Sequence, residues 1–278
     1  MAKIIKKEQL SENVLRYRLD APRIAKKRLA GQFIILRHAE DGERIPLTIA
    51  DADVTGGWIE IIFQVVGKST RQLAAMNEGD DVLDLAGPLG KPTHIEKFGR
   101  CLCIGGGVGI APLYPIVSAL HTAGNEVTVI LGAREKEMLI LENEMKSKAD
   151  RVIVSTDDGS YGLHGKVTDV ITALYEKGES FDAAFIIGPA VMMKFASKMT
   201  IGKNIPTVAS LNPIMIDGTG MCGGCRVTVD GKTQFACVDG PEFDAAGIDW
   251  DELIRRLSGY KEFETNKLKH HCKLEGAQ

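Results

Sequence analysis

Residues 101–124 read CLCIGGGVGIAPLYPIVSALHTAG, an apolar run followed by a glycine-rich turn and then by a segment of helix length. Glycines at such a turn let the backbone approach a pyrophosphate closely, and the amides that begin the helix supply hydrogen-bond donors. Pro112 suits the first helical turn because its missing N–H leaves no hydrogen bond unmade. The stretch predicts a strand, a turn at Gly107 and Gly109, and a helix of a nucleotide-binding domain. A glycine-rich turn that binds nothing is the alternative, and Pro112 stands where the commonest dinucleotide motif has its third glycine.

The same rhythm continues downstream of this stretch. Apolar runs such as EVTVILGA, RVIVSTDDG and FDAAFIIGP alternate with segments of helical length up to about Pro213. Strands that alternate with helices indicate βαβ units and a parallel sheet. We therefore expect an α/β parallel-sheet domain over residues 99–212.

The sequence before residue 99 has a different texture, with short apolar or alternating runs separated by polar and glycine turns. Closely spaced runs of this kind are typical of antiparallel strands in a small barrel. We expect an antiparallel β-barrel domain over residues 1–98, with strands near Val14–Leu19, Gln32–Arg37, Trp58–Val66 and Val82–Leu85.

A cysteine-rich segment follows the α/β pattern. Its spacing is D-x4-C-x2-C-x11-C, the plant-type [2Fe–2S] pattern with an aspartate in place of the first cysteine. Zinc held by three thiolates and one carboxylate is the alternative metal site, and a C-x2-C dithiol would leave the third cysteine without a role. We expect a cluster segment and a final helix over residues 213–278, with the ligands Asp217, Cys222, Cys225 and Cys237.

Composition sets outer limits on function. The 278 residues carry a net charge of −3, which lacks the basic excess of a general nucleic-acid binder. No run approaches the roughly 18 apolar residues of a membrane span, and the N-terminal MAKIIKKEQLSENV has no apolar signal region, so a cytoplasmic location is expected. Cys101 and Cys103 alternate within an apolar strand and are expected in the core. The tail run His270–Cys272 is expected to be a solvated end or a partner contact.

Two strand ends of the α/β domain carry further candidate residues, since ligands of open α/β sheets gather there. Asp157 and Asp158 follow the third strand. A carboxylate at this place accepts hydrogen bonds from a ribose and repels a 2′-phosphate, which favours NAD(H) over NADP(H). Gly188 and Pro189 follow the fourth strand and suit a backbone that passes close to a nicotinamide. Solvated turns are the alternative for both pairs.

The barrel domain carries two candidate segments for a flat, phosphate-bearing cofactor. RIPLTIAD places Arg44 and Thr48 around a strand, and GKST places residues 67–70 at a helix start. A guanidinium suits phosphate, a hydroxyl suits a ring edge, and helix-start amides suit a pyrophosphate. Taken alone, these residues are equally typical of a surface and a helix cap.

The motifs together resemble a known family. RIPLT, GKST, GPLGKP, GGGVGIAP, STDDGSYG, IGP and the cysteine-rich segment occur in the order found in the ferredoxin-reductase superfamily. The cluster segment is similar to the branch that contains the electron-transfer subunit of dihydroorotate dehydrogenase. ERIPLTIAD, ASLNPIMIDGTGMCGGCRV and FACVDGPEFDA resemble the small subunits of electron-bifurcating NADH-dependent ferredoxin:NADP oxidoreductases, also known as sulfide dehydrogenase subunits.

The resemblance implies an oxidoreductase subunit with FAD, NAD(H) and a [2Fe–2S] cluster. Such a subunit moves a hydride between NAD(H) and FAD, and single electrons through the cluster to or from a large flavin and iron–sulfur subunit in a heterodimer. No side chain is expected to act as a general base. The alternatives are an electron-transfer subunit for sulfide or dihydroorotate oxidation, and a noncatalytic module that binds nucleotide or zinc.

The resemblance also assigns residues. Thr48 matches the hydroxyl beside the flavin, while Arg44 stands one residue earlier than the family's arginine. Gly107 and Gly109 match the family's dinucleotide turn. The remaining flavin-side residues are Pro46, Leu47, Gly67, Lys68, Ser69 and Thr70.

Overall fold

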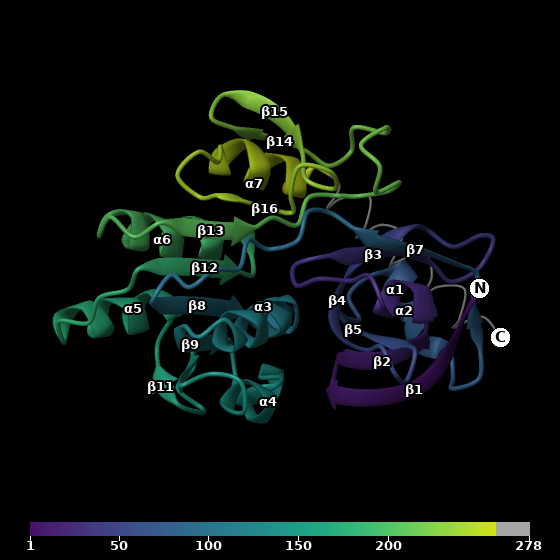
Figure 1. Cartoon of the computed structure of the whole chain (residues 1–278), viewed down its shortest axis with the longest axis horizontal. Helices are drawn as coiled ribbons and strands as arrows, with labels where there is room; N and C mark the ends of the chain where they lie inside the picture. Colours follow the sequence, from purple (N-terminus) through teal and green to yellow (C-terminus); the bar gives the residue numbers. More distant parts are fainter. Residues whose placement is uncertain (260–278) are drawn as a thin grey trace, which may run out of the picture.

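A computed structural model describes residues 1–259 and shows two lobes that lie side by side, with a third segment across one end of them (Figure 1). The N-terminal part of the chain builds one lobe and the middle part builds the other. The tail run His270–Cys272 lies outside the described residues.

The first lobe is a nearly closed antiparallel barrel. In the described part of the chain its strands follow the order β6-β1-β2-β5-β4-β3-β7, and every neighbouring pair is antiparallel. Alternation fills the interior, since Tyr17 and Leu19 of β2 are fully buried, and the Tyr17 ring meets the Phe63 ring edge-on at 5.1 Å. The strands and helices are β1 (Ala2–Ser11), β2 (Val14–Asp20), α1 (Pro22–Ala25), β3 (Phe33–Arg37), β4 (Ile45–Asp53), β5 (Trp58–Gln64), α2 (Lys68–Ala75), β6 (Asp81–Val82) and β7 (Asp84–Leu89).

This confirms the predicted barrel and corrects its details. The strand β1 was not expected, because its sequence AKIIKKEQLS is rich in charge. The run Val82–Leu85 is divided between the end of β6 and the start of β7.

The second lobe is a sheet of mainly parallel strands, as predicted. Its order is β11-β10-β9-β8-β12-β13-β16, and each pair from β11 to β13 is parallel. The elements are β8 (Arg100–Gly106), η1 (Gly107–Gly109), α3 (Ile110–Thr122), β9 (Glu126–Ala133), η2 (Lys136–Met138), α4 (Glu142–Lys146), β10 (Arg151–Thr156), β11 (Leu163–His164), α5 (Val167–Glu176), β12 (Ala183–Ile187), α6 (Ala190–Ile201) and β13 (Thr207–Ser210).

The central strand β8 is buried on both faces, which is why its sequence is a continuous apolar run. Cys101 and Cys103 share a core cluster with α3, whereas Leu102 and Ile104 share another with α5 and α6. Both cysteines are fully buried, so the prediction that they belong to the core is confirmed.

The C-terminal segment is attached to the second lobe through a strand. β14 (Arg226–Val229) and β15 (Lys232–Phe235) form a hairpin, and β16 (Glu242–Asp244) pairs antiparallel with β13 at the edge of the parallel sheet. The helix α7 (Trp250–Ser258) is capped at its N-terminus by Asp249, whose side chain accepts a hydrogen bond from the amide of Glu252 at 2.9 Å. The expected final helix is confirmed. Within residues 1–259, no helix is long and apolar enough to cross a membrane.

Candidate functional site

A cleft of about 1230 Å³ lies between the barrel and the parallel sheet. The barrel lines it with Pro46, Leu47 and Thr48 of β4 and with Thr70 of α2, and the second lobe lines it with the turns that follow β8, β9, β10 and β12. A site for one small molecule usually measures about 300–1,000 Å³. The cleft therefore exceeds the usual size of a site for one small molecule, and both lobes contribute to its walls.

The glycine turn after β8 forms one wall of this cleft. Gly107 has a φ of +55°, and a Cβ atom added to it would meet nothing within 4 Å, so its backbone is open to the cleft. Gly109 is enclosed instead, because an added Cβ would lie 2.7 Å from the Cα of Gly188 and from the oxygen of Ile187. The turns after β8 and β12 thus approach backbone to backbone, which brings together the two pairs of residues predicted for the dinucleotide.

The flavin-side candidates come from β4 and α2. Pro46, Leu47 and Thr48 pair with Ile35, Ile34 and Phe33 of β3, respectively, and line the cleft. Thr70 also lines the cleft, and its Oγ1 accepts hydrogen bonds from the amides of Val66 and Gly67 at 3.0 Å each.

The start of α2 lies beside these cleft residues. The first amides of a helix have no partner inside the helix, so those of Lys68 and Ser69 fit a pyrophosphate at this edge of the cleft. The Ser69 hydroxyl itself donates to Glu43 Oε2 at 2.6 Å. Gly67, Lys68 and Ser69 are thus next to the cleft lining rather than part of it.

The two aspartates after β10 have different surroundings. Asp157 lines the cleft. The Oδ1 of Asp158 accepts hydrogen bonds from the Ser160 amide at 3.0 Å and the Ser160 hydroxyl at 2.7 Å. These hydrogen bonds hold the pKa of Asp158 below its ordinary value and occupy its carboxylate in the turn. Asp157 is therefore the better placed of the two for a ribose.

Several cleft residues were missed by the sequence reasoning. Arg134, Lys166 and Lys198 bring three positive charges to the lining, and Met192 and Phe195 of α6 add apolar surface. Arg134 directly follows β9, and Lys166 is the N-cap of α5. The strand-end rule that singled out Asp157 applies to Arg134 as well, and the positive charges suit a ligand that carries phosphates.

Arg44 does not line the cleft. Its Nε donates a hydrogen bond to the carbonyl oxygen of Ile216 at 2.9 Å, and its Nη1 lies 3.9 Å from Oδ2 of Asp84. The side chain thus faces the cluster segment, although the backbone of Arg44 leads directly into β4.

The four predicted cluster ligands lie in the loop between β13 and β14 and in the turn after β15. The Sγ atoms of Cys225 and Cys237 lie 3.1 Å apart in a buried position. Asp217 and the exposed Cys222 lie on one turn, in which Oδ2 of Asp217 accepts the Cys222 backbone amide at 2.8 Å. A two-iron cluster takes two protein ligands on each iron, so this donor set fits it. Among residues 1–259, no three His, Cys, Asp or Glu side chains form a group placed to hold a single metal ion.

The loop that carries these ligands is shaped by glycines and hydrogen bonds. Gly218, Gly220 and Gly223 have φ values of +76°, +83° and +65°, which a side-chain-bearing residue adopts only with strain. Oδ1 of Asp217 accepts the Thr219 amide at 2.9 Å, and this bond together with that from the Cys222 amide holds the pKa of Asp217 below its ordinary value. Asp217 is therefore an anionic oxygen donor.

The buried cysteine pair is protonated when no metal is bound. Burial, followed by the neighbouring Cys225 thiol, raises the pKa of Cys237 to about 12, so two adjacent thiolates are unfavourable without a positive partner. A coordinating metal deprotonates such thiols outright. The described cysteines are all free of disulfides.

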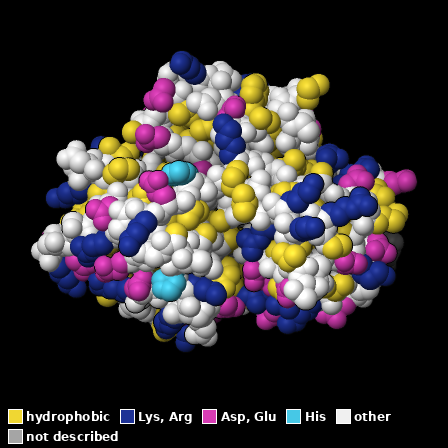
Figure 2. Space-filling view, in the orientation of Figure 1, with side chains coloured by type: hydrophobic (Ala, Val, Ile, Leu, Met, Phe, Trp, Pro, Cys, Tyr) yellow, Lys and Arg dark blue, Asp and Glu magenta, His cyan; other side chains and the backbone are white. Residues whose placement is uncertain are grey.

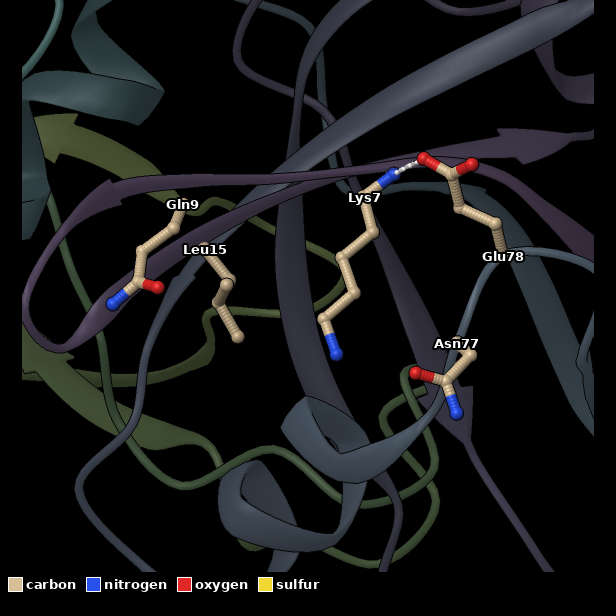
Figure 3. A pocket seen from close by; sticks show the side chains of 5 residues that line it. All are labelled: Lys7, Gln9, Leu15, Asn77 and Glu78. Atoms are coloured by element: carbon tan, nitrogen blue, oxygen red, sulfur yellow. Dashed lines mark hydrogen bonds between the residues drawn. The ribbon is translucent and has the colours of Figure 1, made fainter.

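A second, smaller pocket of about 500 Å³ opens on the barrel surface and is lined by Lys7, Gln9, Leu15, Asn77 and Glu78 (Figure 3). The Lys7 amide donates to Oε1 of Glu78 at 2.8 Å, while its ammonium points away and donates to the carbonyls of Ala74 and Met76, at 2.8 Å each. This lysine closes the C-terminal end of α2, whose N-terminal end adjoins the cleft. The polar side chains of this pocket thus serve to hold α2 against β1 of the barrel.

Comparison with known proteins agrees with the geometry. Residues 1–94 match the family described as "Oxidoreductase FAD-binding domain", residues 103–198 match "Oxidoreductase NAD-binding domain", and residues 212–249 match "Iron-sulfur cluster binding domain of dihydroorotate dehydrogenase B". The chain is 48% identical to the dihydroorotate dehydrogenase B (NAD(+)) electron transfer subunit homolog of Thermotoga maritima, covering 98% of this chain and 96% of that protein. The chain belongs to the family of dihydroorotate dehydrogenase B electron-transfer subunits.

Two further similar proteins support this family assignment. The electron transfer subunit of Geobacillus thermodenitrificans is 34% identical over 88% of this chain and 96% of that protein. A chain in a solved structure of an NADH-dependent reduced ferredoxin-NADP oxidoreductase, studied for flavin-based electron bifurcation, is 46% identical with a TM-score of 0.92 and covers 98% of both chains. The predicted FAD, NAD and iron–sulfur domains are confirmed, and the chain is an oxidoreductase subunit of the electron-transfer type.

Proposed function

We propose that this electron-transfer subunit is the small subunit of an electron-bifurcating complex that couples NAD(H) to NADP(H) and ferredoxin. One observation carries the proposal, namely the similarity over 98% of both chains to a chain of the NADH-dependent reduced ferredoxin-NADP oxidoreductase. The placement of an aspartate beside three cysteines supports it, because Asp217 gives the cluster segment an anionic oxygen donor where the plant-type spacing has a thiolate.

The barrel and the parallel sheet would hold the two organic cofactors. FAD supplies the exchange between two-electron and one-electron steps when it is bound. Thr48 would contact the flavin ring edge from β4, with Pro46 and Leu47 beside it. The amides that begin α2 would hold the pyrophosphate of FAD. We place the boundaries of the three parts at residues 98/99 and 212/213.

The second lobe would orient the dinucleotide. The open backbone of Gly107 and the first amides of α3 would face its pyrophosphate, and Asp157 would accept hydrogen bonds from the ribose. Gly188 and Pro189 would leave space for the nicotinamide beside the flavin. Arg134 and Lys166 would balance the phosphate charge.

The cluster segment would carry single electrons to or from a large flavoprotein subunit. Asp217, Cys222, Cys225 and Cys237 would hold the cluster, which supplies one-electron redox chemistry when bound. The loop itself exposes apolar side chains, and Met221 is 88% exposed beside the ligand Cys222. Hydrophobic side chains also gather in this part of the space-filling view, over the segment between β13 and β14 (Figure 2).

These side chains form an apolar patch around the cluster loop, which we call the loop patch. Exposed apolar surface of this kind marks a contact with another protein. A large subunit docked on the loop patch would come within electron-transfer reach of the cluster, and we therefore propose a heterodimer. The loop patch consists of Ile214, Ile216, Met221 and Val238, which are 39%, 49%, 88% and 44% exposed.

Anaerobic affinity purification of the tagged chain from its own host tests this function. We expect a large flavoprotein subunit to co-purify, and the complex to reduce NADP⁺ only when NADH and reduced ferredoxin are both present. Val238→Asp should release the large subunit. Val54→Asp, which changes a 63% exposed valine on the turn between β4 and β5, should retain it.

The family name favours a second candidate function, electron transfer for dihydroorotate oxidation. Co-purification of a subunit that oxidises dihydroorotate with NAD⁺, and no coupling of NADP⁺ to ferredoxin, would contradict bifurcation and support this second function. The cytoplasmic location stays a prediction.

A further inference from the structure

Three arginines donate hydrogen bonds to backbone carbonyls of the cluster loop. Arg226 donates to Gly223 at 2.9 Å and Arg256 donates to Gly224 at 3.3 Å, and both belong to the C-terminal segment itself. Arg44 donates to Ile216 at 2.9 Å, across 172 positions of the chain. Arg44 thus reaches the loop from the other lobe.

The position of Arg44 joins two parts of the proposed electron path. It immediately precedes β4, whose first residues include the cleft-lining Pro46, Leu47 and Thr48. Its acceptor, Ile216, immediately precedes the ligand Asp217. A single hydrogen bond therefore connects the strand that lines the flavin side of the cleft to the first ligand of the cluster segment.

The surroundings of Arg44 keep its guanidinium in this position. Asp84 of β7 lies 3.9 Å from Nη1, and the same carboxylate is held by Arg37 of β3, whose Nη2 lies 2.6 Å away. The Arg44 side chain is 35% exposed, which leaves it partly enclosed between these groups and the loop.

The loop also packs on the barrel next to this bond. A Cβ atom added to Gly218 would lie 2.7 Å from Leu89 and 2.9 Å from Ile35, so the backbone after Asp217 rests directly on β7 and β3. Asp217 is thus flanked by a hydrogen bond on one side and a backbone packing contact on the other. Both contacts are made to the barrel.

We propose that Arg44 is a positioning residue for the iron–sulfur cluster. By donating a hydrogen bond to the carbonyl of Ile216, it holds the cluster loop next to β4, the strand that lines the flavin side of the cleft. This assignment rests on the proposed function, because it requires the cluster at Asp217. It gives Arg44 a role other than the flavin phosphate contact that the resemblance implies.

Arg44→Met, Arg44→Lys and Arg18→Met test the proposal in the full chain. For Arg44→Met we expect an altered EPR signal of the reduced cluster and iron loss to a chelator about fivefold faster than in the wild type, as removal of one hydrogen bond of about 1 kcal/mol would give. The FAD dissociation constant, measured by flavin fluorescence, should stay within about twofold of the wild-type value, because the hydrogen bond that is removed goes to Ile216 and not to FAD. Arg44→Lys keeps a donor and the charge, so it should restore most of the wild-type signal.

Arg18→Met is the matched control, since it removes a barrel guanidinium of similar exposure (33%), whose Nε donates to Oε2 of Glu60 at 3.0 Å. It should leave both the EPR signal and the iron release unchanged. An unchanged cluster in Arg44→Met overturns the proposal, and an accompanying loss of FAD affinity would assign Arg44 to the flavin phosphates instead. A wild-type protein without any cluster signal contradicts the proposed function, and the positioning role with it.

Discussion

Glu242 makes the free energy of unfolding depend on pH. Replacing Glu242 by glutamine measures the size of this contribution. Glu242 lies on β16, opposite Ser210 of β13, and its Oε1 accepts a hydrogen bond from the Thr93 hydroxyl at 2.7 Å. Thr93 belongs to the connection between the two lobes, and its amide donates to Ala30 of the barrel at 2.9 Å. The carboxyl group is thus enclosed where the barrel, the connection and the edge strand meet.

Burial raises the pKa of Glu242 to about 7 from an ordinary value of 4.5, although the hydrogen bond from Thr93 opposes the rise. The native state therefore binds this proton more tightly than the unfolded state does. Its contribution to stability is fully present below about pH 4.5 and is lost as the pH rises through about 7. One pKa unit corresponds to about 1.4 kcal/mol, so the loss amounts to about 3 kcal/mol.

Glutamine keeps the shape and an acceptor for Thr93, and it carries no charge at any pH. We expect Glu242→Gln to match the wild type near about pH 4.5 and to be more stable by about 3 kcal/mol above about pH 8. At about 2–4 °C per kcal/mol, the variant should then melt about 6 °C or more above the wild type. Thermal unfolding of both proteins, followed by circular dichroism at each pH, gives this difference directly.

The difference between the two proteins is the quantity to compare, because other carboxylates titrate equally in both. A melting difference that is the same at low and high pH would refute the reasoning. Thr93→Val supplies a control, since loss of the hydroxyl should raise the pKa of Glu242 further and move the stability change to higher pH.

Four further substitutions test separate parts of the structure. Arg16→Met removes a cation 3.3 Å from Glu60, whose side chain is 8% exposed, and should cost about 2 kcal/mol in the free energy of unfolding, because Arg18 still pairs with Glu60 at 3.0 Å. Glu144→Gln removes the more exposed partner of Arg16 on α4 and should cost less than about 1 kcal/mol, so equal losses in urea denaturation would contradict this reading. Gly109→Ala places a Cβ against the backbone after β12 and should weaken NADH binding by about tenfold or more, which is about 1.4 kcal/mol, and an unchanged NADH dissociation constant would argue against the turn as the binding site. Gly218→Ala should lower the iron content of the purified protein, because its φ of +76° and its contact with the barrel exclude a side chain, and full iron occupancy would show that the loop tolerates one.

Local sequence predicted those parts of the fold in which one segment forms the feature. Residues 101–124 form a strand, a turn and a helix from consecutive residues, and both the order of these elements and the burial of Cys101 and Cys103 followed from the local sequence. The spacing of three cysteines and Asp217 pointed to an iron–sulfur segment for the same reason, since the ligand set lies within 21 residues.

Features that depend on distant pairing were not predictable in this way. The strand β16 joins the parallel sheet by pairing with β13, which lies more than 30 residues earlier in the chain. The three residues of β16 carry no local pattern that predicts this pairing. The direction of the Arg44 side chain depends on where the loop after β13 returns to the barrel. Asp157 and Asp158 are neighbours with the same side chain, and only the turn geometry shows that Asp158 is occupied by Ser160.

Anaerobic titration of the purified protein with NADH tests the central claim most directly. We expect the bound flavin to be bleached by NADH more readily than by NADPH, and the EPR signal of a reduced [2Fe–2S] cluster to appear, with about two iron atoms per FAD. A protein that contains zinc without iron, or whose flavin is not reduced by NADH, would contradict an NADH-linked flavin and iron–sulfur electron-transfer subunit.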